Sequence, residues 1–258
     1  MSGIYLNKRL PAGGDISRRL GGEMAPVLAD DTGIKKDEVF YTVYRNLEVI
    51  DGKIRYDVTE IPARPAGGPA GPRGENECRK TFGHYHKKPP ASPSQGGLPE
   101  IYEVLEGRAF FLLQLPASPE DQSNIKEAYI AEASAGEKAI IPPEFGHLTI
   151  NVGESTLVLA NWIGLSEYDY DAYKKYRGGC YYVLDKGANI EFEKNKNYSH
   201  VPELKKLKLK KNLPELGLEK DNPQPILNLK NTPKKMDWLS NPENYKELLT
   251  IENLYRTL

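Results

Sequence analysis

The chain has 258 residues and a formal net charge of −1, and hydrophobic and charged residues make up 39% and 28% of it. These values are ordinary for a globular protein with one large domain, or with a core domain and a smaller attachment. The near-neutral charge gives no reason to expect nucleic acid or a membrane surface as a partner. No segment approaches the roughly 18 apolar residues of a membrane-spanning helix, and no signal-peptide core is present, so we expect a cytoplasmic protein.

Residues 38–186 are predicted to form an all-β domain. Short apolar or alternating runs follow one another, and turn signals separate them at intervals of about ten residues. These signals are "DGK" at 51–53, Glu106-Gly107, Ala135-Gly136 and Gly153-Glu154. The run "EIYEVLEGRAFFLLQL" is expected to be a tight hairpin that turns at Glu106-Gly107. Many short strands at this spacing favour a β-sandwich or barrel over βαβ units.

The segments outside this pattern are predicted to be an arm, two loops and an extension. Residues 1–37 form the N-terminal arm, and the Pro- and Gly-rich stretches 61–77 and 87–100 are expected to be loops inside the β domain. Residues 187–258 are rich in lysine and end in a pattern typical of a short helix. We expect this extension to pack on the core or to be partly disordered. Its lysines, interleaved with leucines, indicate a solvated surface rather than a nucleic-acid patch.

The histidines are concentrated in two places, in the short stretch "TFGHYH" and after a Pro-Pro turn. Side chains two residues apart in a strand share a face, so His84 and His86 are expected to project together. Glu100 begins another strand run, and His147 begins a third. Three imidazoles and one carboxylate form a set that suits Fe, Mn, Ni or Zn. The remaining histidine, His200, lies in the lysine-rich extension and is expected to be exposed.

A simpler interpretation has to be weighed against this metal site. A histidine pair in a strand is often only a hydrogen-bonded part of the core. Three of the four histidines, however, fall in the two segments where a metal-binding barrel needs them, together with a carboxylate. The metal site is therefore favoured. The two cysteines are too few for a disulfide framework or a thiolate site and are expected to be packing residues.

The order of these motifs resembles the cupin-type phosphoglucose isomerases of archaea and a few bacteria. The similarity covers about residues 20–186, and the motifs that carry it are "ECRKTFGHYH", Glu100-Ile101-Tyr102, "PPEFGHLTIN" and the TxxP element Thr59–Pro62. The resemblance implies a double-stranded β-helix, the cupin jelly-roll barrel. N-terminal strands and a C-terminal appendage with a short helix would be added to that barrel.

The resemblance also implies an activity, which is interconversion of glucose 6-phosphate and fructose 6-phosphate in glycolysis and gluconeogenesis. A divalent metal would be bound by His84, His86, Glu100 and His147, with Fe²⁺ preferred and Mn²⁺, Ni²⁺ or Zn²⁺ as alternatives. Glu100 would also be the catalytic base that shuttles a proton through a cis-enediol. A metal-assisted hydride shift remains open. The family arrangement further implies a homodimer.

For the phosphate group of the substrate, the resemblance points to hydroxyls and one backbone amide. The expected residues are Thr81, Gly83, Tyr102, Tyr170 and, as the weakest of them, Thr59. Two features depart from the family: the loops at 61–77 and 87–100 are longer, and no histidine precedes Tyr170 at short distance.

Two other functions are compatible with the same residues. A non-catalytic cupin could bind a sugar phosphate or a metal, with the C-terminal extension as a partner-binding segment. An iron-dependent cupin dioxygenase would use nearly the same ligands. The phosphate-type residues Thr81 and Gly83 favour the isomerase over the dioxygenase.

Overall fold

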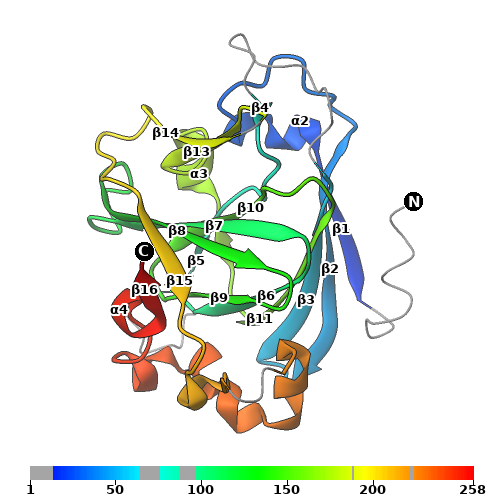
Figure 1. The fold of residues 1–258 in the computed structure, drawn as a ribbon, viewed down its shortest axis with the longest axis vertical. Helices are drawn as coiled ribbons and strands as arrows, with labels where there is room; N and C mark the ends of the chain where they lie inside the picture. The colour runs from blue at the N-terminus through cyan, green and yellow to red at the C-terminus, as the bar shows by residue number, and fades with distance from the viewer. Residues whose placement is uncertain (1–13, 64–75, 88–96, 188, 221–223) are drawn as a thin grey trace.

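The computed structural model describes residues 14–63, 76–87, 97–187, 189–220 and 224–258, and within them two main β-sheets share one hydrophobic core (Figure 1). The six-stranded sheet has the order β1 (Asp15–Leu20), β2 (Val39–Ile50), β3 (Ile54–Ile61), β11 (Leu157–Gly164), β6 (Glu100–Glu106) and β9 (Lys138–Ile141). The five-stranded sheet has the order β10 (Gly146–Asn151), β7 (Arg108–Pro116), β8 (Ile125–Ser134), β15 (Lys205–Leu209) and β16 (Tyr255–Thr257).

Smaller elements complete the described part of the chain. Two short sheets contain β5 (Tyr85–His86) with β12 (Tyr168–Asp169), and β4 (Asn76–Glu77) with β13 (Tyr181–Asp185) and β14 (Ile190–Lys194). The α-helices are α2 (Gly21–Met24), α3 (Asp171–Lys175) and α4 (Ile251–Leu254). The 3₁₀ helices are Ala25–Val27, Pro214–Leu216, Ile226–Asn231, Pro233–Leu239 and Pro242–Tyr245. The two predicted Pro- and Gly-rich loops lie mostly outside the described residues.

The turn predicted at "DGK" is confirmed, and β2 and β3 pair antiparallel across it. Asp51 and Gly52 have φ values of 51° and 63°, the left-handed conformation that a type I′ turn requires at both central positions. The amide of Lys53 closes the turn on the carbonyl of Ile50 at 2.9 Å. The Asp-Gly pair therefore fixed this connection locally.

The hairpin predicted at Glu106-Gly107 is wrong. Strand β6 pairs with β11 and β9, whereas β7 pairs with β10 and β8 in the other sheet. Gly107, with φ of 89°, makes the sharp turn, but the chain crosses from one sheet to the other there. Two apolar runs separated by a turn signal indicate that the chain changes direction, but they do not indicate which sheet the second strand joins.

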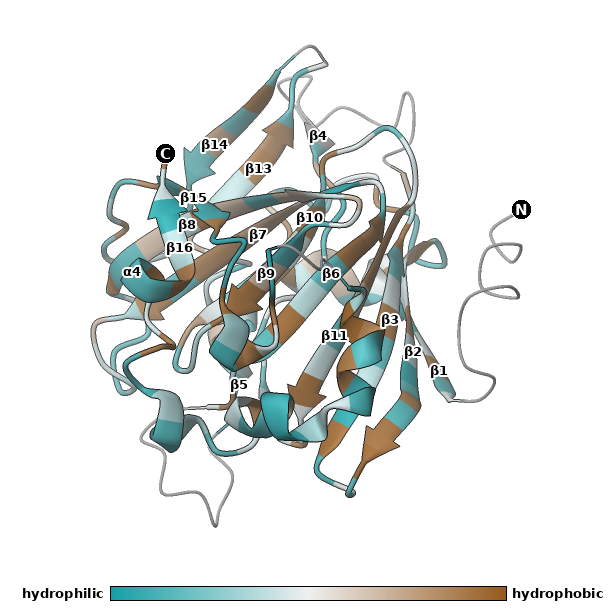
Figure 2. Cartoon of the chain, turned by 60° about the horizontal axis from the view of Figure 1, so that its bottom comes forward, coloured by the Kyte–Doolittle hydropathy of each residue, from teal (hydrophilic) through white to brown (hydrophobic). Residues whose placement is uncertain are grey.

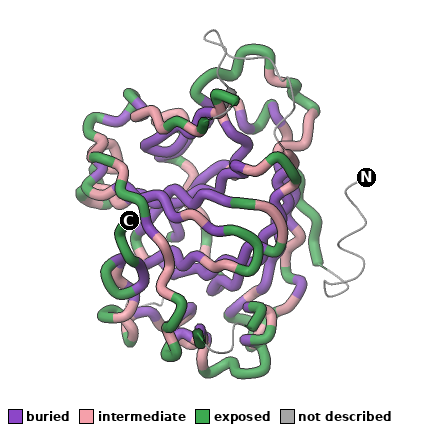
Figure 3. Tube along the Cα trace, viewed as in Figure 1, coloured by how far each residue is buried: buried purple, intermediate pink, exposed green. Residues whose placement is uncertain are grey.

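The same crossing recurs and defines the architecture. β8 and β9 lie in different sheets, and so do β10 and β11. Consecutive strands that alternate between two facing sheets form a jelly roll, so the predicted all-β cupin barrel is confirmed. Figure 2 shows hydrophobic segments along strands of the sheets, and Figure 3 shows that the strands at the centre of the molecule are buried. No helix in the described ranges is both long and apolar enough to span a membrane.

The residues after 187 add strands to the barrel. β15 pairs in parallel with β8, and β16 pairs with β15 (Figure 1). The Tyr255 hydroxyl donates to the carbonyl of Ile140 at 2.6 Å and accepts from its amide at 2.9 Å, which satisfies backbone groups of the edge strand β9. The indole of Trp162 donates to the carbonyl of Ile226 at 2.7 Å. The lysine-rich segment thus covers an edge of each main sheet.

Candidate metal centre

Four potential ligand atoms converge inside the barrel. His84, His86, Glu100 and His147 each present one atom, and these atoms lie within 4.8 Å of one another. Backbone pairing aligns the segments that carry two of them, because the His84 amide donates to the carbonyl of His147 at 3.1 Å and the His147 amide donates back at 3.0 Å. Glu100 is the first residue of β6. The structure therefore brings together the four residues that the sequence predicted as ligands.

The chemistry of this cluster fits a cation. Glu100 Oε2 lies 3.2 Å from Nε2 of both His86 and His147, and Nε2 of His84 lies 3.1 Å from that of His86. Glu100 and His147 are almost fully buried, and Glu100 Oε2 has no hydrogen-bond partner within the described part of the chain. A buried carboxylate oxygen without a hydrogen bond, facing three imidazole nitrogens, is the donor set of a transition-metal site.

Burial sets the charge of the imidazoles. It lowers the pKa of His84 well below the usual value, and the neighbouring His147 and His86 lower it further. Burial also lowers the pKa of His147, although Glu100 acts in the opposite direction. Neutral imidazoles have a lone pair available for a metal.

The carboxylate is ionised. Burial by itself would raise the pKa of Glu100, but the adjacent imidazoles of His147 and His86 hold this pKa below its ordinary value. The cluster therefore contains a single carboxylate, and the charge of a divalent cation would be compensated only in part. That leaves positive charge to attract an anionic ligand.

A contact outside the cluster orients the ring of His86. Nδ1 of His86 lies 2.5 Å from the carbonyl oxygen of Leu98, so it donates there and turns Nε2 towards the cluster. The Tyr102 hydroxyl lies 3.2 Å from Nε2 of His147. Tyr85, between the two histidines, points elsewhere and accepts a hydrogen bond from the Gln114 amide at 2.8 Å. This arrangement agrees with the strand alternation expected from the sequence.

A pocket opens beside the cluster and contains every residue predicted to bind the substrate. Its lining includes His84 and Glu100 together with Thr59, Thr81, Gly83, Tyr102 and Tyr170. The Thr81 hydroxyl accepts from the Thr149 amide at 3.0 Å and donates to no acceptor in the described part of the chain, so its proton is available to a ligand. The Gly83 amide donates to no acceptor in the described ranges.

Gly83 is required for a reason that the sequence did not reveal. Its φ is 85°, and an added Cβ would lie 2.4 Å from the ring of Tyr173. Tyr173 does not line the pocket and instead packs behind Gly83 and against the ring of Tyr85. A side chain at position 83 would therefore clash with Tyr173 and push the Gly83 backbone, which lines the pocket, out of place.

Sequence reasoning missed six residues of the pocket: Tyr41, Val43, Arg45, Asp57, Phe82 and Asn161. The ring of Tyr168 lies 4.2 Å from that of His84 and covers it. Alternation along two strands could have revealed some of the others, since Tyr41, Val43 and Arg45 share one face of β2. Asp57 and Thr59 likewise share one face of β3.

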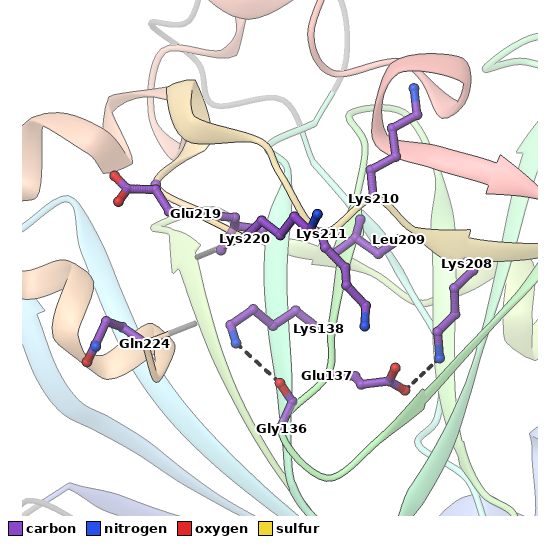
Figure 4. Close-up of a pocket in the computed structure, with 12 residues that line it drawn as sticks. Gly136, Glu137, Lys138, Lys208, Leu209, Lys210, Lys211, Glu219, Lys220 and Gln224 are labelled. Atoms are coloured by element: carbon purple, nitrogen blue, oxygen red, sulfur yellow. Dashed lines mark hydrogen bonds and ion pairs between the residues drawn. The ribbon is translucent and has the colours of Figure 1, made fainter. Parts of the chain in front are cut away.

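A separate cavity of about 240 Å³ contains none of the predicted site residues. It is lined by the turn at Gly136 and by lysines of the C-terminal extension. Figure 4 shows that its charges are already paired in part, with Lys208 against Glu137 at 2.6 Å and Lys138 against the carbonyl of Gly136 at 3.3 Å. The histidine pocket is therefore the better candidate for chemistry.

The sequence is also similar to those of known proteins. A family model described as glucose-6-phosphate isomerase (GPI) matches residues 18–202. A glucose-6-phosphate isomerase of Thermococcus litoralis is 27% identical over 185 residues, which are 69% of this chain and 84% of that protein.

Among solved structures, an oxalate decarboxylase of Bacillus subtilis is 16% identical, with a TM-score of 0.31 over 50% of this chain and 26% of that one. An oxalate oxidase is 19% identical, with a TM-score of 0.30 over 48% and 50% of the two chains. The chain thus spans a quarter to a half of the length of these structures. The family model, by contrast, covers well over half of the chain. The resemblance inferred from the motifs is confirmed, and the chain belongs to the glucose-6-phosphate isomerase family.

Proposed function

We propose that this protein interconverts glucose 6-phosphate and fructose 6-phosphate, as a step of glycolysis and gluconeogenesis. The observation that carries the proposal is the His84–His86–Glu100–His147 cluster, which opens onto a pocket lined by hydroxyl and amide donors. Family membership supports the same reaction. A non-catalytic cupin or a dioxygenase has no comparable support.

The reaction moves a hydrogen between C1 and C2 of the sugar while a carbonyl and a hydroxyl exchange places. A bound divalent metal would supply Lewis acidity to the oxygens on these carbons. The imidazoles of His84, His86 and His147 would hold that metal together with Glu100. Glu100 is ionised, and its Oε2 has no hydrogen-bond partner within the described residues, so it can accept a proton from the substrate. We therefore propose Glu100 as both a ligand and the base of a cis-enediol route.

Thr81, Gly83 and Tyr170 are proposed to hold the phosphate group. The Thr81 proton and the Gly83 amide are both available as donors. Tyr102, near His147, and Thr59 line the same pocket and would contact the sugar or its phosphate. Burial raises the pKa of Tyr102 and Tyr170, so their phenols stay protonated and can donate.

The proposal includes Fe²⁺ as the preferred metal, a cytoplasmic location and a homodimer. Imidazole and carboxylate ligands support iron or manganese over the harder Ca²⁺ or Mg²⁺. The outer edge of β1 is unpaired in the described part of the sheet, and Ile16 on this strand is 56% exposed. A second copy could cover that edge. Light scattering on purified protein checks the mass, and a monomer would contradict the dimer.

One experiment tests the proposed reaction. The protein is stripped with EDTA, reloaded separately with Fe²⁺, Mn²⁺, Ni²⁺ or Zn²⁺, and assayed with fructose 6-phosphate by coupling product formation to glucose-6-phosphate dehydrogenase. We expect activity to be lost with EDTA and restored by at least one of these ions. Absence of turnover with every ion would overturn the proposal. An oxygen electrode distinguishes the dioxygenase, which would consume oxygen.

A further inference from the structure

A second group of charged side chains borders the pocket and has no part in the chemistry described above. Arg45 on β2 and Asp57 on β3 both line the pocket, and Arg55 lies beside Asp57. Arg55 Nε donates to Asp57 Oδ2 at 2.9 Å, and Arg45 Nη1 donates to the same oxygen at 3.4 Å. Two guanidinium groups share one carboxylate, so this wall of the pocket carries a net positive charge.

The backbone beside Arg45 is held in an irregular conformation. Between Tyr44 and Glu48 the register of β2 against β3 shifts, so residues 45–47 stand opposite Asp57 alone. Asn46 within this bulge has a φ of 58°, a conformation that asparagine tolerates better than most residues. The backbone amide of Asn46 donates to Asp57 Oδ1 at 2.9 Å. Bulges of this kind re-aim side chains next to functional sites.

The two arginines differ in how fully their donors are used. Arg55 donates through Nε to Asp57 and through Nη2 to the Tyr168 hydroxyl, and its side chain is 13% exposed. The Arg45 side chain donates only one hydrogen bond within the described ranges, at 3.4 Å to Asp57, and it is 29% exposed. A guanidinium has five N–H donors, so Arg45 keeps most of them available to a ligand. Arg55 is a structural support, whereas Arg45 is free to bind.

The position of Arg45 relates it to both ends of the pocket. It lines the same pocket as Tyr170, at the proposed phosphate end, and as His84 in the metal cluster. Its guanidinium carbon lies 5.8 Å from the ring centroid of Tyr168. The donors assigned to the phosphate so far, Thr81, Gly83 and Tyr170, are all neutral. A phosphate dianion enclosed only by neutral donors would be poorly compensated.

We propose that Arg45 binds the phosphate group of the substrate and thereby gives the protein its preference for phosphorylated sugars. Asp57 is the positioning residue that holds the Arg45 side chain in place. The inference rests on the proposed function for the identity of the sugar, but the recognition of a phosphate dianion at Arg45 is independent of turnover. A guanidinium matches a phosphate through two parallel charge-assisted hydrogen bonds.

The test compares Arg45→Gln and Arg45→Lys with a matched control, Arg108→Gln. Arg108 is an arginine on β7 outside the pocket, 48% exposed and paired with Glu132. We expect Arg45→Gln to raise KM for glucose 6-phosphate by at least about tenfold, the effect of losing a charge-assisted bond, with a much smaller change in kcat. Arg45→Lys should recover part of the affinity, and Arg108→Gln should match the unmodified protein.

Calorimetric binding of inorganic phosphate and of glucose 6-phosphate to the metal-loaded protein separates the two proposals. If the unmodified protein shows no turnover, the proposed function fails, but weaker binding of both probes to Arg45→Gln than to Arg108→Gln still supports Arg45. Equal binding to these two variants would overturn the inference, as would unchanged KM or no phosphate binding at all. Metal content, measured on each variant, should be unchanged, and a loss confined to metal content would also contradict a role in phosphate recognition. If Arg45→Gln does not fold, the intermediate affinity expected of Arg45→Lys provides the same test.

Discussion

Glu100 Oε2 lies 3.2 Å from Nε2 of His147, although the two residues come from strands of different sheets. The contact joins the start of β6 to β10 across the interior of the barrel. It holds the pKa of Glu100 down and leaves an ionised oxygen beside the pocket. Most of the proposed chemistry depends on this relationship.

Replacing Glu100 by glutamine should abolish most of the turnover. The amide keeps the size of the side chain but cannot accept a proton as a base, so we expect kcat to fall by about 10²- to 10⁴-fold. Glu106→Gln, the same substitution at the other end of β6 and outside the pocket, is the matched control. A kcat for Glu100→Gln close to that of Glu106→Gln would contradict the role of Glu100.

Isotope exchange distinguishes the two routes for the hydrogen. In a cis-enediol mechanism the proton carried by Glu100 can exchange with solvent, so conversion in D₂O should place deuterium at C1 or C2 of the product. A direct hydride shift would place none there. Mass spectrometry of the product after partial conversion gives the answer: deuterium on carbon would support proton transfer by Glu100 and contradict an exclusive hydride shift, whereas absence of label even after repeated interconversion would favour the hydride shift.

Replacing His147 by alanine should impair metal binding. Changes to groups that only orient a ligand weaken metal affinity by about 10- to 100-fold, so removal of a ligand should have at least the larger effect. His200→Ala removes an exposed histidine from the C-terminal extension and is the control. Metal content after dialysis, measured by plasma mass spectrometry, should fall only in His147→Ala. Equal metal content in both variants would show that His147 is not a ligand.

Gly83→Ala should destabilise the fold more than Gly136→Ala. Both glycines have positive φ, of 85° and 83°, but an added Cβ meets the Tyr173 ring at 2.4 Å only at position 83. The conformational strain of about 1–2 kcal/mol is common to both variants, and the clash adds to it at Gly83. Urea unfolding measures the free energy of each. Equal destabilisation would mean that the Tyr173 contact contributes nothing.

Tyr255→Phe should lower stability without touching the pocket. The phenol hydroxyl satisfies the amide and carbonyl of buried Ile140 on β9, so its removal leaves both groups unpaired and should cost about 2–3 kcal/mol. Tyr245→Phe, which removes one peripheral bond of 3.3 Å to Asp237, should change the free energy of unfolding by less than about 1 kcal/mol. Equal changes in the free energy of unfolding of the two variants would contradict the expectation that the Tyr255 hydroxyl stabilises β9.

Local rules were enough to predict much of the site. Strand alternation predicted that His84 and His86 would share a face, and the Asp-Gly pair predicted the turn that connects β2 and β3. These features depend only on residues close together in the chain. The same rules gave a wrong hairpin at Glu106-Gly107, because a turn signal carries no information about which sheet receives the next strand.

The sequence by itself determined the strand content, the residues able to bind a metal and the motifs of the family. Only the tertiary structure decided that Tyr168 covers His84 and that Tyr173 packs behind Gly83. Side-chain alternation and turn geometry are set by neighbouring residues, whereas these contacts join segments far apart in the chain. Their distances depend on strand register and on how the two sheets pack, and neither is encoded locally.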